Sequence, residues 1–235
     1  MPLGLTVSAM TDKKRLIVDL VSDPVCPWCY VGLKSYFQAR DRLASDFDLV
    51  TRFRPYQLNP DTPIEGADRE KHYEKKFPDP GFRQNMRTRL IEAAANIGFS
   101  FDPAIPKNLP NTLAAHRLMR WAHFDGKHEK LADKLYSGFW DDDADIGDID
   151  VLAQYANELG LNGTPNDTTE IKDIKTRLLN NEDSDTVAQE AQSFRTAGVN
   201  GVPTFIVNER TGFSGALPPE QLETAIRQAA QQTQS

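Results

Sequence analysis

The chain has 235 residues, of which 39% are hydrophobic and 26% are charged, as in a soluble globular protein with one large domain or two small ones. Its formal net charge of -7 argues against broad binding to nucleic acid or to anionic membranes, because such binding needs a basic surface. No stretch approaches the roughly 20 apolar residues that span a bilayer, so no membrane association is expected.

The first residues do not resemble a secretory signal. A mildly apolar segment, Met1–Met10, precedes the charged run Thr11–Arg15, whereas a secretory signal has its charges before its apolar segment. The chain has two cysteines, and a secreted disulfide scaffold would have more. These features together predict a cytoplasmic protein.

The first elements form a predicted βαβ unit. Leu16–Val21 is a short apolar run typical of a buried strand, and Asp23-Pro24 breaks it. A helical pattern starts at Trp28, and Asp48–Arg54 alternates as a second strand does. Two strands joined by a helix are expected to lie parallel, with a right-handed crossover.

A long helical block follows. Residues 61–80 are rich in charge and proline, which predicts a connection with at most a short helix. Amphipathic spacing and capping signals then predict a series of helices. They are Phe82–Ile97, Asn111–Phe124, His128–Trp140, Asp148–Leu159 and a helix opened by the capping box Asp167–Glu170.

The last part of the chain returns to an α/β pattern. A helix is predicted over Asp185–Ala197, and Thr204–Val207 reads as a strand. Asn208–Gly212 is a predicted turn, Phe213–Gly215 begins a paired strand, and a final helix runs from Pro218 to about Ala230. The outer parts together predict one α/β unit that is interrupted by the helical block.

Cys26 and Cys29 carry the clearest chemistry. Their spacing, at the start of a helix, allows a small disulfide to close. The helix N-terminus favours a thiolate at Cys26, and Pro27 suits the first helical turn because its missing N–H has no helical partner. The alternative is half of a zinc site, for which His123 and His128 are the other candidate ligands. Both lie far downstream, so we expect redox chemistry and no metal.

A proline at the start of a late strand is the second candidate site. Pro203 stands directly before the apolar strand, between Val202 and Thr204. A trans proline that begins a strand is one interpretation, and a cis proline facing the two cysteines is the other. Composition does not decide between them, because only about 5–6% of X–Pro bonds are cis.

Two runs together resemble the DsbA-like branch of the thioredoxin superfamily, and in particular its FrnE-like cytoplasmic members. They are Asp23–Tyr30 and Gly198–Phe205, and the resemblance extends from Leu16 to Ala230. It implies an α/β fold of the thioredoxin-like type with a large all-helical insertion. The thioredoxin-like domain is then residues 1–60 and 183–235, and the insertion domain is residues 61–182.

The resemblance also implies the roles of individual residues. Cys26 is the implied nucleophile, Cys29 the resolving thiol and Pro203 a cis proline beside them. We further expect Pro27, Trp28 and Val202 to contact substrate. The residue before the second cysteine is Trp28, where the periplasmic DsbA pattern has histidine. The resemblance therefore does not imply whether the protein oxidises or reduces its substrates.

The implied activity is thiol–disulfide exchange on proteins or small molecules, by a monomer or a homodimer. No cofactor is expected beyond the redox-active disulfide, with glutathione as a candidate co-substrate. Two alternatives stay open. One is a glutathione-dependent isomerase or kappa-type glutathione transferase, in which a serine takes the place of Cys26. The other is a redox-linked chaperone or binding module. We also expect the insertion to form a cap beside the cysteines that selects substrate.

Overall fold

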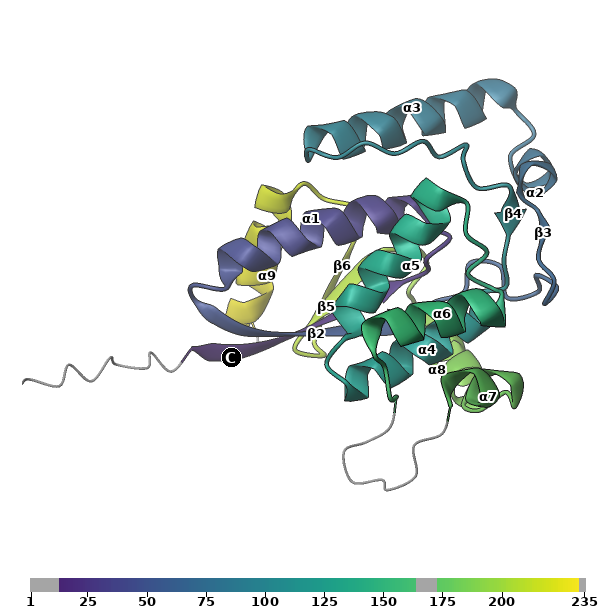
Figure 1. Ribbon diagram of the computed structural model, residues 1–235. Coiled ribbons are helices and arrows are strands. Elements are labelled where there is room, and N and C mark those ends of the chain that lie inside the picture. The colour runs from purple at the N-terminus through teal and green to yellow at the C-terminus, as the bar shows by residue number, and fades with distance from the viewer. Residues whose placement is uncertain (1–12, 164–172, 233–235) are drawn as a thin grey trace, which may run out of the picture.

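The computed structural model describes residues 13–163 and 173–232 (Figure 1). Within them the central sheet has four strands in the order β2–β1–β5–β6. They are β1 (Lys14–Ser22), β2 (Phe47–Pro55), β5 (Thr204–Val207) and β6 (Thr211–Ser214). β1 and β2 are parallel, which confirms the predicted βαβ unit, whereas β5 and β6 extend the sheet in antiparallel pairing.

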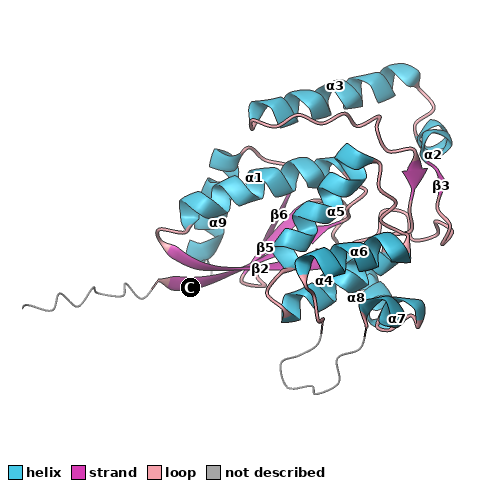
Figure 2. Cartoon of the chain, viewed as in Figure 1, coloured by secondary structure: helices cyan, strands magenta, loops and turns pink. Residues whose placement is uncertain are grey.

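Helices cover both faces of this sheet (Figure 2). They are α1 (Pro27–Leu43) and α9 (Pro219–Gln232), which pack against each other on one face, and α8 (Ser184–Thr196), which contacts β2 from the other. Leu20 and Phe205 are buried cross-strand partners, and the ring of Tyr36 on α1 lies 5.9 Å from that of Phe205. Alternation of apolar residues along β1 and β5 thus builds the core beneath α1.

Between β2 and α8, the described residues form helices and one two-residue strand pairing. These elements are β3 (Ala67–Asp68), α2 (Arg69–Lys76), α3 (Pro80–Asn96), β4 (Asn108–Leu109), α4 (Leu113–Phe124), α5 (His128–Asp142), α6 (Ile149–Leu159) and α7 (Ile174–Leu179). β3 and β4 pair with each other and not with the central sheet. The predicted α/β fold with a helical insertion is therefore confirmed. The domain boundaries at 60/61 and 182/183 stay a prediction.

The insertion covers the edge of the sheet at β2. The backbone N–H of Phe53 on this strand donates to Nε2 of His123 on α4, at 3.2 Å. The hydroxyl of Thr51 donates to Glu129 on α5, at 2.7 Å. An uncovered edge strand exposes unpaired backbone groups to other chains, so these contacts give α4 and α5 a structural role.

A single hydrophobic core joins the insertion to the sheet. Leu33 on α1, Leu118 on α4 and Trp140 on α5 are all fully buried in it. The indole N–H of Trp140 also donates to the carbonyl oxygen of Pro24, at 2.9 Å. This hydrogen bond fixes α5 against the turn between β1 and α1, which lies directly before Cys26.

Two boundaries differ from the prediction for local reasons. α3 begins at Pro80, before the predicted start at Phe82, because the Asp79 carboxylate caps it by accepting from Gly81 N at 2.8 Å. β6 begins at Thr211 because Asn208 and its neighbour take positive φ angles, which shortens the turn. The capping box at 167–170 lies outside the described residues.

Candidate active site

The chain enters α1 at Cys26, which is the residue that caps the helix. Cys26 has an extended backbone, with φ -87° and ψ 115°, and Pro27 is the first helical residue. The carbonyl oxygen of Cys26 accepts from the backbone N–H of Cys29 at 3.0 Å and of Tyr30 at 3.2 Å. Cys26 therefore stands at the helix N-terminus, where the first backbone N–H groups have no partner within the helix.

The two thiols lie together but in different surroundings. Cys26 and Cys29 are 3.4 Å apart and are both free. Cys29 is 1% exposed, and burial, with the neighbouring Cys26 adding to it, raises the pKa of the Cys29 thiol well above its usual range. Cys26 is 5% exposed and lines a surface groove. One thiol can thus meet a substrate while the other stays protonated behind it.

Pro203 lies beside this pair, as predicted. The Val202–Pro203 peptide bond is cis, and the Cys26 Sγ–H donates to the Val202 carbonyl oxygen at 3.7 Å. The ring of Pro203 packs directly on Gly32 of α1. A Cβ at this glycine would come within 2.7 Å of the proline Cγ, so the absence of a side chain there permits the close approach.

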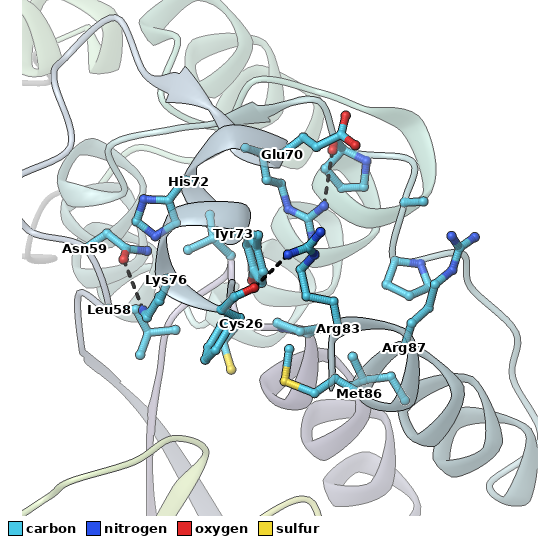
Figure 3. A pocket seen from close by; sticks show the side chains of 18 of the residues that line it. Cys26, Leu58, Asn59, Glu70, His72, Tyr73, Lys76, Arg83, Met86 and Arg87 are labelled. Carbon is cyan, nitrogen blue, oxygen red and sulfur yellow. Dashed lines mark hydrogen bonds between the residues drawn. The ribbon is translucent and has the colours of Figure 1, made fainter. Parts of the chain in front are cut away.

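A groove of about 590 Å³ opens at Cys26. One wall is the start of α1 with Pro27 and Trp28, which are both half-buried, and the facing wall comes from α2 and α3. Figure 3 shows that Tyr73 on α2 and Arg83 on α3 both point into the groove. Its volume is within the range of about 300–1,000 Å³ that holds a small ligand or a short peptide segment.

Charge and burial shape the α2 wall. The guanidinium of Arg69 stacks over Tyr73, 4.7 Å from the ring centroid, and donates to the carbonyl oxygen of Pro106 at 3.3 Å. Burial raises the pKa of Tyr73, so its phenol stays protonated at neutral pH. Burial, with the charge of Lys76 nearby, lowers the pKa of His72, so the His72 imidazole is uncharged at neutral pH.

A buried carboxylate lies beneath the cysteines. Asp23 is fully buried and accepts from the backbone N–H of Leu58 at 2.7 Å and of Val25 at 3.5 Å. Nε2 of the buried His116 is 3.8 Å from the same carboxylate. These contacts tie the strand end before Cys26 to the loop that follows β2.

The structure gathers the predicted residues at one place. Cys26, Pro27 and Trp28 line the groove, while Val202 and Pro203 adjoin Cys26 on the side of the sheet. Sequence reasoning did not assign a role to Gly32, Asp23, His116 or the groove residues of α2 and α3. Asp23 stands three residues before Cys26, and only that nearness could have drawn attention to it. No sequence signal marks the others.

Neither a metal site nor a membrane-spanning helix is found among the described residues. The described part of the chain holds no group of three or more His, Cys, Asp and Glu side chains placed to bind a metal ion. His123 and His128 stack on each other with ring centroids 4.0 Å apart, on the edge of the sheet at β2. None of the described helices combines the length and apolar character needed to cross a membrane.

Known proteins share this architecture. A family model described as a DSBA-like thioredoxin domain matches residues 17–227. The uncharacterized protein YwbO of Bacillus subtilis is 25% identical over 213 residues, which is 89% of this chain and 94% of that protein. The probable DsbA oxidoreductase SCO1869 of Streptomyces coelicolor superposes with a TM-score of 0.78 and 25% identity, covering 92% of this chain and 90% of that one. The cytosolic disulfide reductase DsbM of Pseudomonas aeruginosa, solved with GSH, has a TM-score of 0.58 and 15% identity, with 92% and 99% covered.

Proposed function

This chain belongs to the DSBA-like thioredoxin domain family, and on that premise we propose that it is a thiol–disulfide oxidoreductase. Cys26 is its nucleophile and Cys29 its resolving thiol. The observation that carries the proposal is the free dithiol at the start of α1, with one sulfur on the groove and the other enclosed.

The exchange proceeds in two steps that balance atoms and electrons. The Cys26 thiolate attacks one sulfur of a substrate disulfide, forms a mixed disulfide and releases the other sulfur as a thiolate, which takes up a proton. Cys29 then loses its proton and attacks the Cys26 sulfur. This step forms the Cys26–Cys29 disulfide and releases the second substrate thiol. Two electrons pass from the dithiol to the substrate, and the reverse sequence oxidises a substrate dithiol.

The surroundings of the two sulfurs support this order of events. The raised pKa of Cys29 keeps it protonated until the mixed disulfide forms, so the reduced protein offers one nucleophile at a time. Val202 and Pro203 adjoin Cys26, where an extended substrate would pass, so we assign them and the groove residues Pro27 and Trp28 to substrate contact.

The proposed setting is the cytoplasm, with protein or small-molecule disulfides as substrates. A fold neighbour described as a cytosolic disulfide reductase supports this setting. Glutathione is a proposed co-substrate, because a fold neighbour was solved with GSH. The likeness to that neighbour, at 15% identity, is one of fold.

The test uses the fact that the chain has only two cysteines. The reduced protein is alkylated briefly near neutral pH, and both positions are quantified by tandem mass spectrometry of the tryptic peptide 16–34. We expect Cys26 to be labelled much faster. Cys29→Ser should accumulate mixed disulfides with insulin, whereas Cys26→Ser should abolish exchange, because the attacking sulfur is gone. Pro203→Thr should slow the release of mixed disulfides.

Faster labelling of Cys29, or trapping by Cys26→Ser in place of Cys29→Ser, would reverse the assignment. A protein that binds reduced insulin but transfers no electrons would be a chaperone or binding module. The isomerase and transferase alternative is less well supported, because a site that only activates glutathione has no need of a second thiol 3.4 Å behind the first.

A further inference from the structure

We infer that the groove beside Cys26 selects disulfides flanked by carboxylates, and that Arg83 and Arg87 on α3 are the residues that select them. This inference rests on the proposed exchange at Cys26 and adds a substrate class to it. It starts from a contrast in charge. The whole chain is acidic, with a net charge of -7, whereas five Lys and Arg side chains and two acidic side chains line the groove.

Neutral oxygens are the main partners of two of these cations, Arg83 and Lys76. Arg83 donates to the carbonyl oxygens of Phe77 at 2.7 Å and Pro78 at 3.2 Å, and its closest acidic partner, Glu74, is 3.9 Å away. Lys76 donates to the side-chain oxygen of Asn59 at 3.4 Å. Neutral oxygens hold a cation in place without cancelling its charge. The groove therefore keeps a positive potential.

Some cations elsewhere on the molecule are matched by carboxylates at short range. Arg52 makes two hydrogen bonds to the buried Asp19, at 2.6 and 2.7 Å, and Lys134 lies 2.5 Å from Glu158. In the groove, Arg87 pairs with Asp102 at 2.8 Å, but both side chains are more than 40% exposed and can exchange partners. An anion entering the groove thus meets charge that the protein has not already neutralised.

The groove also offers a buried donor and apolar walls. Nε of Arg69 is buried and makes no hydrogen bond. Met86 (Figure 3) and Leu90 lie on the same helix as Arg83 and also line the groove. Their side chains can therefore cover the aliphatic part of a bound substrate. Partial enclosure lowers the local dielectric constant and strengthens attraction between an arginine and a substrate carboxylate. The chemistry that fits is a small or peptidic disulfide with carboxylates next to its cysteine.

The experiment compares three symmetrical tripeptide disulfides with blocked ends, Glu-Cys-Glu, Gln-Cys-Gln and Lys-Cys-Lys. Rates with the reduced protein are divided by the rates of the same disulfides with dithiothreitol, which removes their intrinsic reactivity. We expect the Glu peptide to react about tenfold faster than the Lys peptide at low salt, with the ratio falling at high salt. Arg83→Gln and Arg87→Gln should each lower the rate with the Glu peptide about two- to fivefold.

Arg89→Gln is the matched control, because Arg89 is exposed on the same helix outside the groove and loses the same charge. It should change the Glu rate less than twofold, and Arg83→Lys should keep the preference. Equal normalised rates for the three peptides, or equal losses in Arg83→Gln and Arg89→Gln, would overturn charge selection while leaving exchange intact. Failure of the neutral Gln peptide and of both others to react would overturn the proposed function and this inference together.

Discussion

The two halves of the helical insertion are built differently. No side chain of α2 is fully buried, and only Leu90 and Ala94 of α3 are buried, whereas α4 and α5 each bury seven residues. The α4–α5 half covers the edge strand β2, and the α2–α3 half forms the wall of the groove at Cys26. A single insertion thus holds one part that completes the fold and another that lines the groove at Cys26.

This division of the insertion predicts that substitutions in its two halves affect stability differently. Substitutions in the α4–α5 half should lower the free energy of unfolding, whereas substitutions on the open surface of α3 should leave it nearly unchanged. Equal sensitivity in both halves would remove the distinction. The predictions below test it, beginning with the largest change in stability.

Trp121→Ala should cost about 3–5 kcal/mol of unfolding free energy, because it opens a large cavity in the core. Trp121 is fully buried on α4, and its indole N–H donates to Asp183 at 2.7 Å. Urea unfolding followed by circular dichroism measures the loss. Phe82→Ala on α3 is the comparison, since Phe82 is 49% exposed, and it should cost less than about 0.5 kcal/mol. Similar losses in the two variants would contradict the division.

Arg117→Met should cost about 2–4 kcal/mol, because it leaves buried carbonyl oxygens without a donor. Arg117 is 2% exposed and donates to the carbonyl oxygens of Arg177, Leu178 and Glu182, at 2.8, 3.2 and 2.5 Å. It therefore fixes the end of α7 against α4.

The matched control for this arginine is Arg120→Met on the same helix. The Arg120 side chain is 41% exposed, and its ion pairs with Asp183 and Glu190 are both 3.8 Å long. We expect a loss below about 1 kcal/mol in the same urea titration. A larger loss than that of Arg117→Met would show that buried carbonyl contacts do not stabilise this half.

Acid should destabilise the protein through His123. Burial, followed by the neighbouring His128, lowers the pKa of His123 to about 3. The unfolded chain takes up this proton at about pH 6.5, so the stability from neutral His123 is full above that pH and is lost as pH falls toward 3. The loss at pH 5 should be about 2 kcal/mol.

Unfolding midpoints measured between pH 7 and pH 5 test this dependence. His123→Gln keeps an oxygen that can accept from the N–H of Phe53 but has no group that titrates in this range. We expect the variant to show a flatter dependence of stability on pH than the native protein. An unchanged slope would place the acid sensitivity in another part of the molecule.

Ile91→Ala on α3 should have the smallest effect, less than about 0.5 kcal/mol, because Ile91 is 41% exposed. Leu90, the preceding residue, is 5% exposed and anchors the helix. Leu90→Ala should therefore cost about 2 kcal/mol or more in the same unfolding experiment. If Ile91→Ala proves as costly as Leu90→Ala, α3 is packed more closely than its open face indicates.

Much of the fold could be predicted because its signals are local. The strand Thr204–Val207 was predicted with its observed bounds, since its apolar run lies between a proline and a turn. α6 was predicted to start after an acidic cap, and Asp148 accepts from Asp150 N at 2.6 Å. In each case the signal lies within a few residues of the feature it predicts. The shortened turn at Asn208 was not foreseen, because positive φ angles depend on the register between β5 and β6.

The sequence by itself determined the pair of cysteines at the start of a helix, because Cys26, Pro27 and Cys29 are neighbours along the chain. Only the tertiary structure decided what surrounds them. Arg83 reaches the groove because the insertion folds back over α1, and Cys29 is enclosed because the core closes around it. The spacing of residues along the chain predicts the secondary structure of one helix or strand. The burial and charge around a sulfur depend on residues that are distant in sequence and come together only in the folded protein.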